Sequence, residues 1–222
     1  MDINDCISHI PKALMNQSGS VFYSGANAFT GTKSLYVLGI NPGGSIETQA
    51  AETVAWHTDK VLNVMPVDWS AYRDESWAGK VPGTNKMQPR VLHLFEQLGL
   101  AAGDVPASNL VFMRSSRENT LEGNIDQLAN LCWPFHSFVI NQLKPRVVLC
   151  LGQTPGNFMR SKLNAGSQND KFVEQNNRGW TSRTYAAGPG QPVVVVVTNP
   201  SIANWCNPAT DPSPLVQRAL AA

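Results

Sequence analysis

Two asparagine–proline pairs stand where buried strands are expected to end, and their amide side chains could bind a planar ligand. Asn41 follows the apolar run "LYVLGI" and opens the turn "NPGG", while Asn199 ends the run "PVVVVVTNPS". In both pairs, proline restricts the preceding asparagine to an extended backbone. Each amide then offers donors and an acceptor. If both strands end at one edge of a sheet, the two amides suit a neutral hydrogen-bonding ligand such as the edge of a nucleobase.

The turn after the first run does not match the common phosphate-binding loops. A dinucleotide site needs G-x-G-x-x-G opening a helix, but "GINPGG" lacks the second glycine, and Pro42 removes an amide that could face a pyrophosphate. A P-loop needs a lysine after its glycines, and "GGS" has none. The alternative that these observations leave open is a turn that ends a strand and has no chemical role.

The elements that must position these residues alternate between strands and helices. Continuously apolar strands are expected at 35–40, 107–113, 144–152 and 192–201, and a hairpin is expected within 164–191. Helical spacing predicts helices at 91–98, at 125–143 with a kink near Pro134, from 153 onward and near 213–221, and a weaker one at 3–15 that contains Pro11. Strands apolar on both faces favour a parallel sheet with helices on both sides. We therefore predict a three-layer α/β/α sandwich around a central four-stranded parallel sheet.

Length and composition describe one ordinary globular domain. The chain has 222 residues, a formal net charge of +1 and four scattered cysteines without a CxxC pair. We expect a single domain over 1–222 with a loop-rich insertion at about 45–85, and we expect a monomer. The near-neutral charge argues against a tight non-specific nucleic-acid binder. Reduced cysteines, an acidic start and short apolar runs predict a cytoplasmic protein with no membrane partner.

Three motifs, taken in order, resemble the uracil-DNA glycosylase superfamily. "GINPGG" is similar to the Gly-x-(Asn/Asp/Ala)-Pro-Gly/Tyr motif that ends the first strand there, in the asparagine version of mismatch-specific and single-strand-selective members. "TNPSIANW" is similar to the (His/Asn)-Pro-Ser motif after the last strand. Between them, "SNLVFMRSS" and "LANLCWPFHSFVINQLKPRVVLCLG" are similar to the iron–sulfur-type members. The likeness is piecewise and covers roughly residues 33–205.

The chain departs from these families at informative positions. Cys132 falls where one cluster cysteine would sit, but Met113 replaces its partner and the amino-terminal CxxC is absent. No iron–sulfur cluster is therefore expected, and the resemblance implies no metal and no diffusible cofactor. The first motif carries no aspartate and the second no histidine, which bears on rate and base preference more than on fold.

The resemblance implies a monofunctional enzyme that hydrolyses the N-glycosidic bond of a base flipped out of DNA. Asn41 would position the attacking water, and Asn199 would donate to the O2 atom of the departing base anion. Because an amide is a poor general base, bond breaking would precede attack by water. The base pocket would be completed by main chain around Gly39, Ile40, Pro42, Gly43 and Gly44.

Several other positions allow two interpretations each. Asn109 matches the base-reading asparagine of the family, or it is a turn residue at a strand edge. Trp56 is the first aromatic residue after the first motif, with Trp69 and Tyr72 behind it, and it would either stack on the base or belong to the core of the insertion. His57 could approach the pocket, whereas His136 is expected in the core.

DNA contacts are expected around the second motif. Pro200 and Ser201 would contact a phosphate, and Ile202 or Trp205 would fill the gap left by the flipped base, unless these two form a buried first turn of a helix. Arg114, at the end of the second strand, is an alternative phosphate or base contact. A loose basic stretch that includes Arg178 could also touch phosphates.

The sequence therefore predicts a DNA glycosylase for uracil or a related deaminated base, with DNA as partner. Two alternatives remain open at this stage. One is a catalytically silent member of the same fold that binds nucleic acid or a nucleobase. The other is an unrelated α/β enzyme that acts on small nucleotides.

Overall fold

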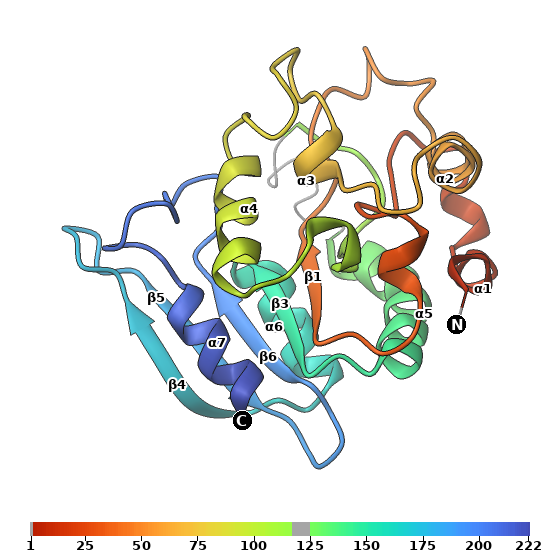
Figure 1. The fold of residues 1–222 in the computed structure, drawn as a ribbon. Coiled ribbons are helices and arrows are strands. Elements are labelled where there is room, and N and C mark those ends of the chain that lie inside the picture. The colour runs from red at the N-terminus through yellow and green to blue at the C-terminus, as the bar shows by residue number, and fades with distance from the viewer. Residues whose placement is uncertain (1, 117–124) are drawn as a thin grey trace.

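The central element is a mixed β-sheet with helices on both of its faces (Figure 1). A computed structural model describes residues 2–116 and 125–222 of the chain. Within these residues the sheet has six strands in the order β2-β1-β3-β6-β5-β4. The strands are β1 (Leu35–Gly39), β2 (Ala107–Asn109), β3 (Val147–Leu151), β4 (Ser167–Val173), β5 (Thr181–Ala186) and β6 (Val193–Val197).

The expected parallel strands are present, but the sheet is larger than predicted. Strands β2, β1, β3 and β6 are mutually parallel. The hairpin of β4 and β5 then pairs antiparallel with the outer edge of β6. Sequence reasoning identified this hairpin but not its addition to the sheet, because its polar strands carry none of the apolar signal of a buried strand.

The apolar strands are buried on both faces, as continuous valine and leucine runs indicate. Alternate residues of β1, β3 and β6 point to opposite sides and form two separate cores. One core contains Tyr36 and Leu38 together with residues of α5 (Ile125–Leu143) and α6 (Gln153–Lys162). The other contains Leu35 and Val37 together with residues of α4 (Gln88–Gln97) and α7 (Ser213–Ala221). Figure 1 shows α4 and α7 on the near side of the sheet.

Three further α-helices of the described residues precede α4. They are α1 (Ile3–Ile7), α2 (Val54–Asn63) and α3 (Ala71–Asp74). The 3₁₀ turns η1 (Lys12–Leu14) and η2 (Ala26–Phe29) also precede α4, and η3 (Ala102–Asp104) follows it. The predicted helix at 3–15 stops early because Pro11 lacks the amide that would continue it. The 45–85 segment is more regular than expected, since it contains α2 and α3. None of the helices in the described ranges is both long and apolar enough to cross a membrane.

The second strand is shorter than predicted, and this changes the position of Asn109. Strand β2 ends at Asn109 rather than at residue 113. Beyond it, Leu110 N donates to Gly39 O at 2.9 Å and Val111 N donates to Ile40 O at 2.9 Å. The apolar run that follows Asn109 is buried because it passes beneath the turn after β1 and not because it forms a strand. Asn109 therefore lies at the carboxyl end of β2.

Candidate functional site

The carboxyl ends of the four parallel strands bring the predicted asparagines to one edge of the sheet. Leu35 pairs with Val147, and Val147 pairs with Val193. Asn41 and Asn199 each lie six residues beyond a member of this row, so they leave the sheet at the same level. Only β3 separates their strands, which sets the strand axes about 10 Å apart. The two Asn-Pro turns therefore lie near one another at this edge of the sheet.

Asn199 lies over the end of β3. Its Nδ2 donates to Leu151 O at 3.0 Å, and its Oδ1 accepts from Ser201 N at 2.8 Å. Gly152 follows β3 with a φ of 122°, which favours glycine, and a Cβ there would be in ordinary contact with Asn199 Nδ2 at 3.6 Å. An amide nitrogen carries two hydrogens. One Nδ2 hydrogen of Asn199 is therefore held by Leu151, which fixes the side chain, and the other is free to donate.

The side chain of Asn41 offers a hydrogen-bond acceptor, whereas that of Asn199 offers a donor. Its Nδ2 donates to Pro42 O at 2.8 Å and to Ser115 O at 3.4 Å. Its Oδ1 accepts no hydrogen bond from the described residues. The residue is half-buried, and its Oδ1 is not among the fully buried atoms that lack a partner, so this oxygen is an open acceptor. A water molecule or an N–H group of a ligand is the partner that such an oxygen would take.

The turn that bears Asn41 is held by Arg114 and not by a ligand. The guanidinium of Arg114 donates to Gly43 O at 2.6 Å and to Ser18 Oγ at 3.1 Å. It also pairs with Glu52 at 2.9 Å. Arg114 is buried, so its position disfavours the predicted contact with DNA. Its effect on the site is indirect, through the shape of the turn after β1.

Asn109 has an unusual environment for a buried amide. The residue is 5% exposed, and its Nδ2 forms no hydrogen bond of full geometry with the described residues. Its side chain lies across Gly39, where a Cβ would stand only 2.2 Å from Asn109 Oδ1. A buried donor without a partner costs about 1–3 kcal/mol. The absence of a side chain at Gly39 leaves space for the Asn109 amide, and the Nδ2 of Asn109 lacks a partner in full hydrogen-bond geometry among the described residues. Both features are typical of a residue that binds a ligand.

Three side chains form a contiguous group beside Asn109 that sequence reasoning did not assign. Burial is the main cause of the raised pKa of Tyr23, and the charge of Glu75 raises it further, whereas the neighbouring side chains of Ser20 and Asn109 lower it by hydrogen bonding. Trp77 Nε1 donates to Glu75 Oε2 at 2.8 Å, and the Trp77 and Tyr23 rings meet edge to face with centroids 6.4 Å apart. Burial also raises the pKa of Glu75. The density of aromatic residues between 69 and 77 was the available signal, but it did not single out Trp77.

Trp56 and His57 occupy different positions on α2. Trp56 is 45% exposed and lies beneath Lys60, whose Nζ is 5.0 Å from the ring centroid. His57 is buried, and burial, with smaller contributions from Lys60 and Arg114, lowers its pKa to about 4. Because the buried His57 is neutral near neutral pH, it cannot act as a general acid there.

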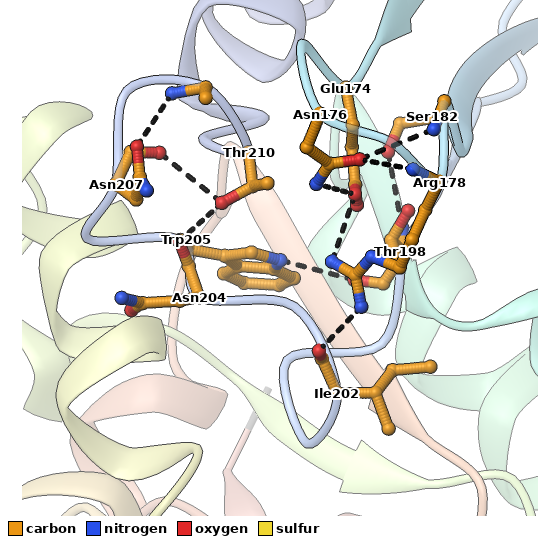
Figure 2. A network of polar contacts seen from close by, with 12 residues as sticks. Glu174, Asn176, Arg178, Ser182, Thr198, Ile202, Asn204, Trp205, Asn207 and Thr210 are labelled. Atoms are coloured by element: carbon orange, nitrogen blue, oxygen red, sulfur yellow. Dashed lines mark hydrogen bonds and ion pairs between the residues drawn. The ribbon is translucent and has the colours of Figure 1, made fainter.

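Residues of the second motif divide between surface and core. Ser201 is exposed and Ile202 is 56% exposed, so either can meet a ligand. Pro200 is buried in the turn. Trp205 is completely buried and its Nε1 donates to Thr198 O at 3.1 Å, so it supports the turn from within (Figure 2). Of the two predicted wedge residues, only Ile202 has a suitable position.

The remaining chemistry-bearing side chains are structural. His136 is a buried residue of α5, its Nδ1 is 2.8 Å from the hydroxyl of Tyr36 in β1, and burial lowers its pKa to about 4. Cys132 is a buried free thiol, and burial raises its pKa to about 12. Within residues 2–116 and 125–222, no three His, Cys, Asp or Glu side chains are grouped so that they could hold a metal ion. The chemistry of the edge is thus that of three amides.

No protein-family model matches the chain, and no curated protein matches it either. The interpretation of the edge therefore depends on its geometry.

Proposed function

We propose that the protein is a DNA glycosylase that hydrolyses the N-glycosidic bond of uracil, or of a related deaminated base, after the base has left the DNA stack. The proposal combines the resemblance of the two Asn-Pro motifs with the arrangement of amides at one edge of the sheet. Three uncharged amides with open hydrogen-bonding atoms suit a neutral base with both donors and acceptors on its rim. Flipping costs a few kcal/mol, which contacts in the pocket offset.

Asn199 would stabilise the leaving base. When the glycosidic bond breaks, its electron pair stays on the base, and negative charge develops on the carbonyl oxygen beside the reacting nitrogen. The free Nδ2 hydrogen of Asn199 would donate to that oxygen. Because Leu151 O and Ser201 N already hold this amide, little reorganisation is needed as charge develops. Removing one preorganised donor of this kind typically costs about 10²–10³ in rate.

Asn41 would orient the attacking water. Its open Oδ1 can accept a hydrogen bond from a water that adds its oxygen to C1′ of the sugar, while the proton released passes to solvent. An amide cannot take up that proton. The sugar must therefore carry most of the positive charge before water attacks, and the rate depends more on Asn199 than on Asn41.

The observation that carries the proposal is the buried amide of Asn109, whose Nδ2 has no partner in full hydrogen-bond geometry among the described residues and faces the nearby Tyr23 side chain. A donor buried at 5% exposure and incompletely satisfied is costly unless a ligand completes its hydrogen bonding. Its Nδ2 would donate to a carbonyl of the base, and its Oδ1 would accept from the ring N–H of uracil. Cytosine carries a hydrogen-bond acceptor where uracil has this N–H, so a site of this form discriminates between the two bases.

A second candidate function is a silent member of the same fold that binds a base without releasing it. It is favoured by the contacts of Asn41, which include no carboxylate or imidazole among the described residues. Such a protein would keep the recognition role of Asn109 and lack hydrolysis.

The test is incubation of the purified protein with single- and double-stranded uracil oligonucleotides, followed by alkaline cleavage of abasic sites. Strand breaks that are lost in Asn199→Ala and Asn41→Ala but kept in Asn141→Ala support the proposal. Asn141 is an exposed asparagine on α5, near the opposite edge of the sheet, and is a matched control. Binding without cleavage favours the silent protein, and activity on free nucleotides alone favours an enzyme of small nucleotides.

A further inference from the structure

A hollow adjoins the turn that carries Asn199, on the side of the β4–β5 hairpin. It has a volume of about 480 Å³, within the range of about 300–1,000 Å³ typical of ligand sites. Its lining comes from α4, from the loop between β4 and β5, and from the segment after β6. It consists of two arginines, four asparagines, one threonine and Ile202, with no acidic side chain. A hollow with this lining favours an anionic ligand rich in hydrogen-bonding groups.

The two arginines connect the hollow to the turn after Asn199. Arg90 donates to Pro200 O, and Arg178 donates to Ile202 O at 3.0 Å. Figure 2 shows Arg178 reaching from the hairpin loop to Ile202. A ligand that binds these arginines would therefore also affect the position of the turn that follows Asn199.

Arg178 is preorganised for such a ligand. It pairs with Glu174 at 3.0 Å, and its guanidinium lies 4.0 Å from the centroid of the Trp180 ring. Asn176 donates to the same oxygen of Glu174 at 2.8 Å. The other oxygen of Glu174 is buried and has no partner among the described residues. A guanidinium carries five N–H donors, so Arg178 keeps donors for a ligand after these contacts are made.

Asn177 and Asn204 are the free polar side chains of the hollow. Both are exposed and line it, and neither side chain makes a hydrogen bond to another described residue. Asn176 and Asn207, by contrast, are used within the protein: Asn176 Oδ1 accepts from Arg178 N at 2.9 Å, and Asn207 Oδ1 accepts from Ala209 N at 3.0 Å. Asn177 and Asn204 are thus available to contact the edge of a base or the sugar.

From these observations we infer that the hollow is a subsite for a nucleotide of the DNA strand that flanks the flipped one. The phosphate would lie against Arg178 and Arg90, and the sugar and base against Asn177, Asn204 and Ile202. The inference rests on the proposed function, since it assumes that the base beside Asn199 belongs to a DNA strand. A strand held on both sides of the turn would keep the flipped nucleotide in place without a strongly basic surface, in accord with the net charge of +1.

The test measures binding of a single-stranded oligonucleotide by fluorescence anisotropy, with a variant that places two negative charges in the hollow. Asn177→Asp combined with Asn204→Asp should weaken binding about tenfold or more, because each new carboxylate repels the backbone. The control combines Asn27→Asp with Asn141→Asp, two exposed positions outside the hollow, and should change binding less than twofold. Free deoxynucleoside monophosphate, added as competitor, separates a strand subsite from a mononucleotide site.

Equal affinity of the hollow variant and its control would overturn the inference, and so would failure of the wild-type protein to bind the oligonucleotide. Efficient displacement of the oligonucleotide by the free monophosphate would also overturn it. Base release is measured on the same samples by alkaline cleavage. A loss of binding in the hollow variant without any base release in the wild type would support the subsite and reject the glycosylase. Base release by the wild type that is unchanged in the hollow variant would support the glycosylase and reject the subsite.

Discussion

Substitution of Gly39 by alanine tests whether the glycine exists to admit Asn109. The new Cβ would lie 2.2 Å from Asn109 Oδ1 and 3.3 Å from Asn109 Cγ, whereas Cβ contacts below 3.0 Å are essentially never seen. Asn109 is 5% exposed and cannot move freely. Overpacking of this kind typically costs about 1–3 kcal/mol. We expect Gly39→Ala to lower the free energy of unfolding by that amount and to reduce uracil release at least about tenfold.

A double-mutant cycle isolates the contact. In an Asn109→Ala background the clashing atoms are gone, and the nearest remaining neighbour of the new Cβ is Ser108 O at 4.0 Å. Gly39→Ala should then cost less than about 0.5 kcal/mol, so the two sites should couple by about 1 kcal/mol or more. Asn109→Ala alone should leave stability unchanged or raise it, because it removes an incompletely satisfied buried donor, while uracil release falls.

The assays are urea unfolding and single-turnover release of uracil. Gly188→Ala is the matched control, since a Cβ at Gly188 would meet no atom within 4 Å, and it should preserve both stability and activity. An equal cost of Gly39→Ala in both backgrounds would refute the reasoning. A large loss of stability in Asn109→Ala would show that this amide is structural.

Three further predictions address the neighbouring groups. Asn199→Ala should slow base release about 100-fold in single-turnover experiments while oligonucleotide affinity changes less than about threefold; a comparable loss of affinity would show that Asn199 only binds. Arg114→Ala should cost about 2 kcal/mol in urea unfolding, because the Gly43 carbonyl and the Glu52 carboxylate lose their donor, and unchanged stability would contradict the role given to Arg114. Burial lowers the pKa of His57 from its usual 6.5 to about 4. Between pH 4 and pH 6.5, His57 is therefore protonated in the unfolded chain but neutral in the folded protein. The stability that His57 contributes is complete above pH 6.5 and should fall by up to roughly 3 kcal/mol as the pH drops to 4; His57→Gln should flatten that dependence, and an unaltered pH profile would show that His57 titrates normally.

The sheet was predictable from the sequence because its strands are buried on both faces. Continuous apolar runs located β1, β3 and β6, and the Asn-Pro turns located the carboxyl ends of β1 and β6. The hairpin was also anticipated, but its pairing with β6 was not. Its strand β4 is mostly exposed, so the sequence carries no signal for the edge on which it lies.

The limits of β2 were predicted wrongly for a physical reason. The run Leu110, Val111 and Phe112 is as apolar as a strand and is buried, yet it lies beyond β2. Burial alone produced the pattern that was taken for a strand. Asn109 was consequently expected near the start of a strand over 107–113, whereas it lies at the carboxyl end of β2, where its side chain crosses Gly39.

Sequence reasoning located the turn residues at the edge of the sheet more accurately than it located the aromatic residues. The proline after Asn41 and after Asn199 marks a local backbone restriction, which sequence alone reveals. The environments of Trp205, which is buried, and of Trp77, which bonds Glu75, depend on tertiary contacts. No local pattern distinguishes these tryptophans from the exposed Trp56.

The central claim is that Asn41, Asn109 and Asn199 converge on one base, and NMR of the side-chain amides tests it most directly. The protein labelled with ¹⁵N is titrated with a short single-stranded oligonucleotide that carries an uncleavable uracil nucleotide, and each amide pair is assigned by substitution. We expect the three pairs to shift together with one dissociation constant, while the pair of Asn141 stays unchanged. Shifts confined to Asn41 and Asn199, with the buried amide of Asn109 unmoved, would contradict the account.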